Sequence, residues 1–128
     1  MYSTRPISLR QMGMSREAYR ELEYFCLQYA QKRREAAQLL GAKGEAGRRR
    51  ARLLRDVDII EGAARAAAED LAPYLLRAVT ERAGVQSVFA RTRPPVGERQ
   101  FYNLRKRFFV ELKRRRENGS MECSSFEV

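Results

Sequence analysis

Four side chains in the segment 98–116 could read the edges of DNA bases by hydrogen bonding: Arg99, Tyr102, Asn103 and Lys106. Asn suits adenine and Arg suits guanine in the major groove, because each side chain forms two hydrogen bonds to that base. Five further cations could hold phosphates: Arg91, Arg93, Arg107, Lys113 and Arg114. These residue types predict a nucleic-acid-binding surface. A solvated polar residue is the alternative interpretation of Asn103.

A single amphipathic helix over 98–116 would position these side chains. Four apolar residues fall within about 80° of one another at 100° per residue: Phe101, Leu104, Phe108 and Leu112. Arg99, Lys106 and Lys113 lie on the opposite side of such a helix. We therefore expect the apolar stripe to enter a core and the cationic side to enter a DNA major groove.

The charge of the chain is concentrated in the same region. Residues 91–116 hold ten Lys/Arg and two Glu, which gives +8, whereas the whole chain carries +10. Residues 51–90 hold five Arg and six acids, which gives −1. Such asymmetry is typical of a protein with a polyanionic partner. A solvated basic helix that keeps the protein in solution is the alternative interpretation.

Enzyme chemistry finds little support in the sequence. The chain has no His, which excludes Ser/His and Cys/His pairs, and no phosphate-binding loop of the Gly-Lys-Ser type. Its two cysteines, Cys26 and Cys123, stand far apart and have no neighbouring ligand pattern for zinc. We expect no catalytic residues, no metal and no cofactor. The longest apolar runs are too short for a membrane span, so we expect a cytoplasmic protein with no membrane partner.

The rest of the chain is predicted to be all-α. Residues 1–14 read as a flexible arm, and 15–70 as a long helical hairpin whose helices cover about 15–40 and 48–69 around the Gly-rich break 41–47. The second of these helices has a coiled-coil-like seam that could also pair with a second copy of the chain: Leu53, Val57, Ile60, Ala64 and Ala67.

Residues 71–117 read as a helix-turn-helix-like unit, and 118–128 as a disordered tail that begins as the last helix ends near Gly119. The unit has an anchor helix, a short helix over about 85–91, a turn over about 92–97 and the basic helix. This turn exceeds the usual three or four residues of a helix-turn-helix. The alternative is that these helices complete a five-helix bundle.

Three groups of segments resemble a family of small phage and prophage proteins with a helix-turn-helix-like C-terminal part. They are 19–22 with 25–29, then 59–61 with 75–80, and finally 95–97 with 101–102, 105–109 and 112. The last group, Pro-x-Gly followed by an aromatic-basic-aromatic run, is the most specific. The chain departs from the family in its short linker 41–47 and in Pro94 before the turn.

This resemblance implies an all-helical protein of a mobile element, acting in the cytoplasm of a bacterial host cell. The leading hypothesis is a DNA-binding transcriptional regulator that reads the major groove with the helix 98–116. Double-stranded DNA, a second copy in a homodimer and RNA polymerase are its expected partners, and a monomer is the alternative to the dimer. The alternative function is a non-enzymatic helical assembly or adaptor protein for packaging or virion building. Its basic helix would meet an acidic partner or non-specific nucleic acid.

Overall fold

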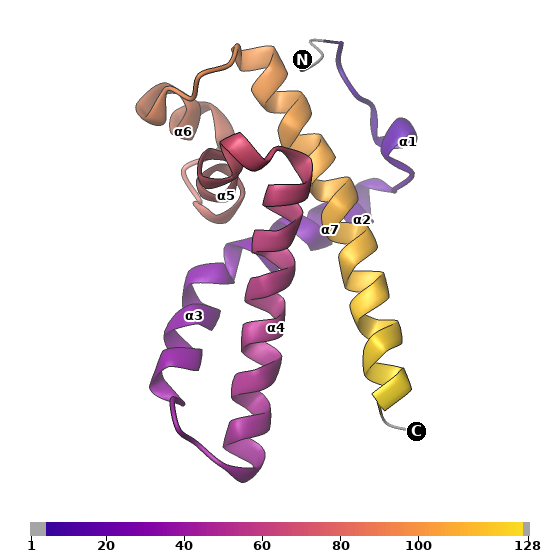
Figure 1. Cartoon of the computed structure of the whole chain (residues 1–128). Coiled ribbons are helices and arrows are strands. Elements are labelled where there is room, and N and C mark those ends of the chain that lie inside the picture. Colours follow the sequence, from indigo (N-terminus) through magenta and orange to yellow (C-terminus); the bar gives the residue numbers. More distant parts are fainter. Residues whose placement is uncertain (1–4, 127–128) are drawn as a thin grey trace.

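The structure is a computed structural model that describes residues 5–126, with side chains over residues 5–118. All regular structure in that range is helical, which confirms the predicted all-α class (Figure 1). The elements follow in the order α1 (Leu9–Met12), α2 (Arg16–Leu27), α3 (Tyr29–Gln38), α4 (Gly44–Ala67), the 3-10 turn η1 (Glu69–Leu71), α5 (Ala72–Thr80), α6 (Val85–Thr92) and α7 (Glu98–Phe126).

Helix α7 is the spine of the molecule, because every other α-helix except α3 packs against it. Its apolar stripe is almost inaccessible to solvent, with Phe101, Phe108, Phe109 and Leu112 at 0% and Leu104 at 1% exposure. The ring of Phe109 lies 4.9 Å, between centroids, from that of Tyr19 on α2. Burying one such side chain contributes about 1.5–3 kcal/mol, so this stripe fixes α7 in the core.

Helix α4 approaches α7 closely because small residues lie between them. Its buried residues include Gly62, Ala63 and Ala64, and α4 and α7 pack directly against each other. The seam predicted on α4 is also used inside the chain, since Val57, Ile60 and Ala64 are 5%, 0% and 1% exposed. The seam therefore does not present these three residues to a second copy, as the monomer alternative expects, whereas Leu53 and Ala67 are half-buried.

The helix predicted over 15–40 is broken at Gln28. The Gln28 N–H donates to the carbonyl of Phe25, three residues earlier, at 3.3 Å, and α3 starts in a new direction (Figure 1). Helix α2 buries Leu22, Phe25 and Cys26 beside α5 and α7, whereas α3 packs mainly on α4. One straight helix could not cover both partners, which accounts for the break.

Helices α3 and α4 run antiparallel and side by side, joined by a turn over 39–43 (Figure 1). We call this pair, residues 29–67, the hairpin. It is shorter than the hairpin predicted over 15–70 because α2 belongs to the core. Its turn lies at the end of the molecule opposite α6 and the start of α7 (Figure 1).

Residues 5–14, which we call the arm, contain a helix turn and pack on the core, where the sequence predicted a flexible arm over 1–14. Ser8 and Gln11 form a capping box at the start of α1, and Gly13 ends this helix in the left-handed region at φ 70°. Met12 and Met14 are 6% and 9% exposed, so they belong to the core. These two methionines therefore attach the arm to the core.

The segment 71–117, for which the sequence predicted a helix-turn-helix-like unit, holds α5, α6 and the first part of α7. Val88 of α6 is 0% exposed, and the Phe89 ring lies 5.5 Å from that of Phe101. The turn between α6 and α7 contains Arg93, with φ 47°, and the buried Pro94. These contacts fix the start of α7 against α6.

Helix α7 continues to Phe126, beyond the end predicted near Gly119. The predicted disordered tail 118–128 is therefore helical as far as Phe126, and its residues 127–128 lie outside the described range. A single glycine inside a helix costs only about 1 kcal/mol relative to alanine. Neighbouring turns can absorb that cost, so Gly119 need not end the helix.

Candidate nucleic-acid interface

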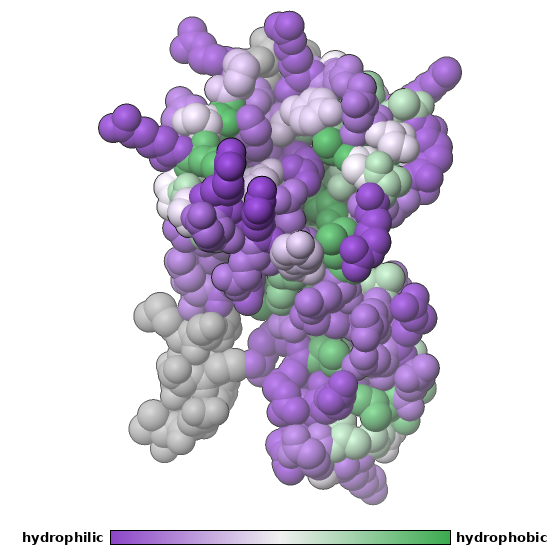
Figure 2. Space-filling model, turned by 180° about the vertical axis from the view of Figure 1, so that it is seen from behind, coloured by the Kyte–Doolittle hydropathy of each residue, from purple (hydrophilic) through white to green (hydrophobic). Residues whose placement is uncertain are grey.

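The outer side of α7, opposite its buried stripe, carries seven of the nine side chains predicted to bind nucleic acid. They are Arg99, Tyr102, Asn103, Lys106, Arg107, Lys113 and Arg114. Arg91 lies on α6, and Arg93 follows it. Seen from behind, the end of the molecule opposite the turn of the hairpin is mainly hydrophilic, with long side chains extending into solvent (Figure 2).

Three of the side chains on α7 donate hydrogen bonds to backbone carbonyls of the arm. The pairs are Asn103 Nδ2 to Arg5 (2.6 Å), Lys106 Nζ to Ile7 (2.6 Å) and Lys113 Nζ to Gly13 (2.9 Å). The arm therefore follows α7 in the same direction over about three turns. The two bonds from the charged ammonium groups of Lys106 and Lys113 contribute roughly 1.5–3 kcal/mol each, and the bond from the neutral amide of Asn103 contributes about 0.5–1.5 kcal/mol.

Asn103 corrects the sequence prediction, because its side chain does not face solvent. It is 5% exposed, and the arm covers it. The residue does lie on the outer side of α7, as helical periodicity predicts, but that side is occupied. Base edges are out of its reach while the arm is in place. The covering residue, Arg5, is 98 positions away in the sequence, so no local pattern could reveal the contact.

Other cations near the arm remain open to solvent. Arg93, Arg99 and Arg107 are exposed and form no ion pair within the described chain, and Tyr102 is half-buried. Arg10 of the arm is exposed in the same way. Arg10 makes the arm slightly basic in the sequence but is not among the predicted binding residues, although the Ser8 and Gln11 spacing is a signal that the arm contains a helix turn.

Two predicted phosphate contacts, Arg91 and Arg114, already bind carboxylates within the chain. Arg91 Nη2 lies 2.7 Å from Glu81, and Arg77 binds the same carboxylate at 3.0 Å. The hydrogen bond from Arg91 is the main reason that the pKa of Glu81 is below its ordinary value. Arg114 pairs with Glu111, one turn earlier on α7. Both arginines are still more than half exposed, so a phosphate could compete for them.

A groove of about 360 Å³ lies between the arm and the end of α4. Its lining includes Met12 of the arm, Ala66 and Ala67 of α4, and Lys106 and Arg107 of α7. An anionic group could enter it, because the cations on its wall outnumber its one carboxylate. That carboxylate, on Glu111, is already paired with an arginine.

Arg105, in the middle of the basic run, points into the protein. Its Nη1 donates to the hydroxyl of Tyr19 at 2.6 Å, its Nη2 to Glu23 at 3.1 Å, and its guanidinium lies 4.9 Å from the centre of the Phe109 ring. Burial raises the pKa of Tyr19, so this hydroxyl stays protonated at neutral pH. Arg105 is therefore a structural cation, and the charge of the segment 91–116 overstates what faces outward.

Comparisons with protein-family models, with curated proteins and with solved structures find no match for this chain. A functional conclusion must therefore come from its geometry. Within the described residues, no helix is both long and apolar enough to cross a membrane. In the same part of the chain, no three His, Cys, Asp or Glu side chains gather closely enough to hold a metal ion.

Proposed function

We propose that the protein binds duplex DNA through the arm and the outer side of α7 together, as a transcriptional regulator encoded by a phage or prophage. One observation carries the proposal: Arg10, Arg93, Arg99 and Arg107 are exposed and have no carboxylate partner among the described residues. Guanidinium groups bind phosphate through two parallel hydrogen bonds. A chain with net charge +10 would also attract DNA at long range.

The order α5, α6, α7 supports a helix-turn-helix mode of docking. In that mode α6 crosses the DNA backbone and the first turns of α7 enter the major groove. Arg99 and Tyr102 lie in those turns and would read base edges. Asn103 and Lys106 would join them when the arm leaves α7, because the arm now holds both side chains.

The same arm contacts favour a second candidate function. While Asn103, Lys106 and Lys113 bind the arm, the surface offers phosphate contacts but few base contacts. A helical assembly or adaptor protein with non-specific affinity for nucleic acid would need nothing more. RNA polymerase and a second copy of the chain are proposed as partners only if the protein is a regulator. Any dimer contact would then lie outside the buried part of the seam on α4.

Salt dependence tests the proposed surface. If the protein neutralises about five phosphates, the logarithm of duplex affinity should fall with the logarithm of salt at a slope of roughly −4 to −5. R99Q/R107Q should bind more weakly and lower the slope by about 2. R65Q/R82Q removes the same charge from exposed sites elsewhere and should act as wild type. No binding at low salt, or equal affinities of the two double variants, would overturn the proposal.

Selection from a random duplex pool separates the two candidate functions. A regulator should enrich a defined sequence, and R99Q should relax the preference at one or two positions of it. An assembly protein should bind without enrichment. Because backbone contacts carry no sequence information, this result does not depend on the strength of binding.

A further inference from the structure

The hairpin carries a second cationic surface, distinct from the arm and α7. Residues 32–56 contain nine Lys/Arg and three acids, which leaves a formal charge of +6. The cations are Lys32, Arg33, Arg34, Lys43, Arg48, Arg49, Arg50, Arg52 and Arg55. The turn of the hairpin lies at the opposite end of the molecule from the start of α7 (Figure 1).

The three carboxylates of this segment are already engaged by its own cations. Glu45 binds Arg48 at 3.0 Å and Arg52 at 3.2 Å, Glu35 binds Arg49 at 3.0 Å, and Asp56 binds Lys32 at 2.8 Å. Hydrogen bonds from Arg48 to Glu45 and from Arg49 to Glu35 are the main reasons that the pKa of each carboxyl is lowered. Both stay ionised at neutral pH, and the excess of cations remains.

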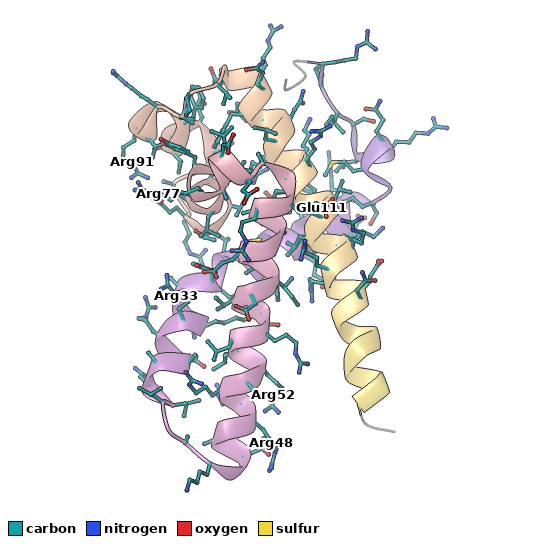
Figure 3. The ribbon with its side chains drawn as sticks, viewed as in Figure 1. Arg33, Arg48, Arg52, Arg77, Arg91 and Glu111 are labelled. Atoms are coloured by element: carbon teal, nitrogen blue, oxygen red, sulfur yellow. The ribbon has the colours of Figure 1, made fainter. Side chains whose placement is uncertain are left out.

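Seven of the nine cations are exposed: Arg33, Arg34, Lys43, Arg48, Arg49, Arg52 and Arg55. Even the paired side chains of Arg48, Arg49 and Arg52 are 65%, 60% and 59% exposed. Ion pairs this exposed are weak because water screens them, so an outside phosphate can replace their carboxylate. Arg33 on α3 and Arg48 and Arg52 on α4 stand out from the ribbon in Figure 3.

The backbone beneath these cations is held in place. Tyr29 donates a hydrogen bond to Glu61 across the two helices, and Arg50 Nε donates to the carbonyl of Ala36 at 3.2 Å. From residue 43 to residue 55, α4 rises about 18 Å. A duplex carries one phosphate per about 1.7 Å of its axis with both strands counted, or one per about 3.4 Å along each strand, so that length of one strand carries about five phosphates. The cations are therefore presented on a fixed rod of suitable length.

We propose that the hairpin is a second surface for the backbone of duplex DNA, so that one chain holds two duplex segments. A protein partner is less suited to it, because stable protein interfaces have a core depleted of charge. The hairpin is largely hydrophilic and shows only small apolar patches in Figure 2. The binding of the first duplex rests on the proposed function, whereas the binding of the second rests on the hairpin alone.

Sedimentation velocity with a duplex of about 12 base pairs, roughly 40 Å long, counts the duplexes bound to each chain. The wild type should bind two. R33Q/R34Q/K43Q should bind one, since these three exposed cations have no ion pair in the described chain and only Arg33 makes another contact, over the ring of Tyr29 at 5.6 Å. R20Q/R65Q/R82Q removes three exposed charges outside both surfaces and should still bind two. Circular dichroism melting checks the fold of each variant.

A hairpin variant that still binds two duplexes would overturn the inference. R99Q/R107Q tests the proposed function separately, because it should retain one duplex on the hairpin. If the wild type binds only one duplex, the variant that no longer binds it identifies the binding surface. Loss in R33Q/R34Q/K43Q would leave the hairpin and overturn the proposed function, and loss in R99Q/R107Q would overturn the inference. If the hairpin variant keeps both duplexes but loses affinity for polyglutamate, the surface serves an acidic protein and the inference is wrong.

Discussion

The outer side of α7 and the hairpin are both rich in arginine and lysine, but their cations are held by different partners. On α7, Asn103, Lys106 and Lys113 bind backbone carbonyls of the arm, about 100 residues away. On the hairpin, the paired cations bind carboxylates of the same two helices. A surface held by a separate segment can be uncovered by moving that segment. A surface held by exposed local ion pairs is open at all times.

The two surfaces also show that net charge in the sequence differs from charge at the surface. The segment 91–116 has the higher formal charge, yet Arg105 points inward and Arg91, Arg114 and Arg116 bind carboxylates. The hairpin segment has the lower charge, but seven of its nine cations are exposed, against six of the ten in 91–116. The side of the helix on which each cation lies, relative to the core, decides whether that cation is exposed to a ligand.

Phe108→Ala should give the largest effect and should separate the two regions by stability. Phe108 is 0% exposed at the centre of the stripe on α7, and such a truncation costs about 3–5 kcal/mol. Leu40→Ala, at the turn of the hairpin, where Leu40 is 75% exposed, should change stability by less than about 0.5 kcal/mol. Urea denaturation measures both. Similar losses would mean that the hairpin turn, too, is part of the cooperative core.

Lys106→Met should release the arm, because it removes the ammonium that binds the Ile7 carbonyl but keeps most of the aliphatic chain. A hydrogen bond from a charged group contributes about 1.5–3 kcal/mol, so the open state of the arm should gain at least about tenfold in population. Trypsin cleavage after the exposed Arg10 should accelerate by that factor. Arg107→Met loses the same charge without touching the arm, and an equal acceleration there would contradict the arm contact.

The sequence predicted what depends on periodicity, namely the all-α class and the buried stripe Phe101, Leu104, Phe108 and Leu112. It did not predict the break at Gln28, because both sides of it are helical and only the separate demands of the core and of α4 divide them. The cover over Asn103 was equally hidden, since it depends on a contact between the two ends of the chain. Nor did it reveal the hairpin surface, whose cations matter only once α3 and α4 lie together.

Lys32→Met should weaken the hairpin by a smaller amount. Lys32 Nζ lies 2.8 Å from Asp56 and 4.2 Å from the centre of the Phe25 ring, and its side chain is only 14% exposed. We expect a loss of about 1 kcal/mol, near the upper end for such pairs. Arg34→Met removes an exposed cation from the same helix and should leave the melting temperature unchanged. If both variants melt alike, the pair with Asp56 does not hold the hairpin together.

The smallest effect should come from acid. Arg48 and Arg49 hold the pKa values of Glu45 and Glu35 below the ordinary 4.5. A carboxyl with a lowered folded-state pKa stabilises the fold above its unfolded pKa, and that stability is lost as pH falls through the folded pKa. The melting temperature should therefore decline slightly between about pH 5 and pH 3, and Glu45→Gln should reduce this decline. Asp58→Asn, also on α4 but without an ion pair in the described chain, should leave the decline unchanged.

Carboxyl carbon NMR gives the direct check: a Glu45 midpoint at or above 4.5 would show that Arg48 and Arg52 do not bind it in solution. Their guanidinium groups would then be more open to phosphate than the structure shows, which would sharpen the contrast with the covered side of α7.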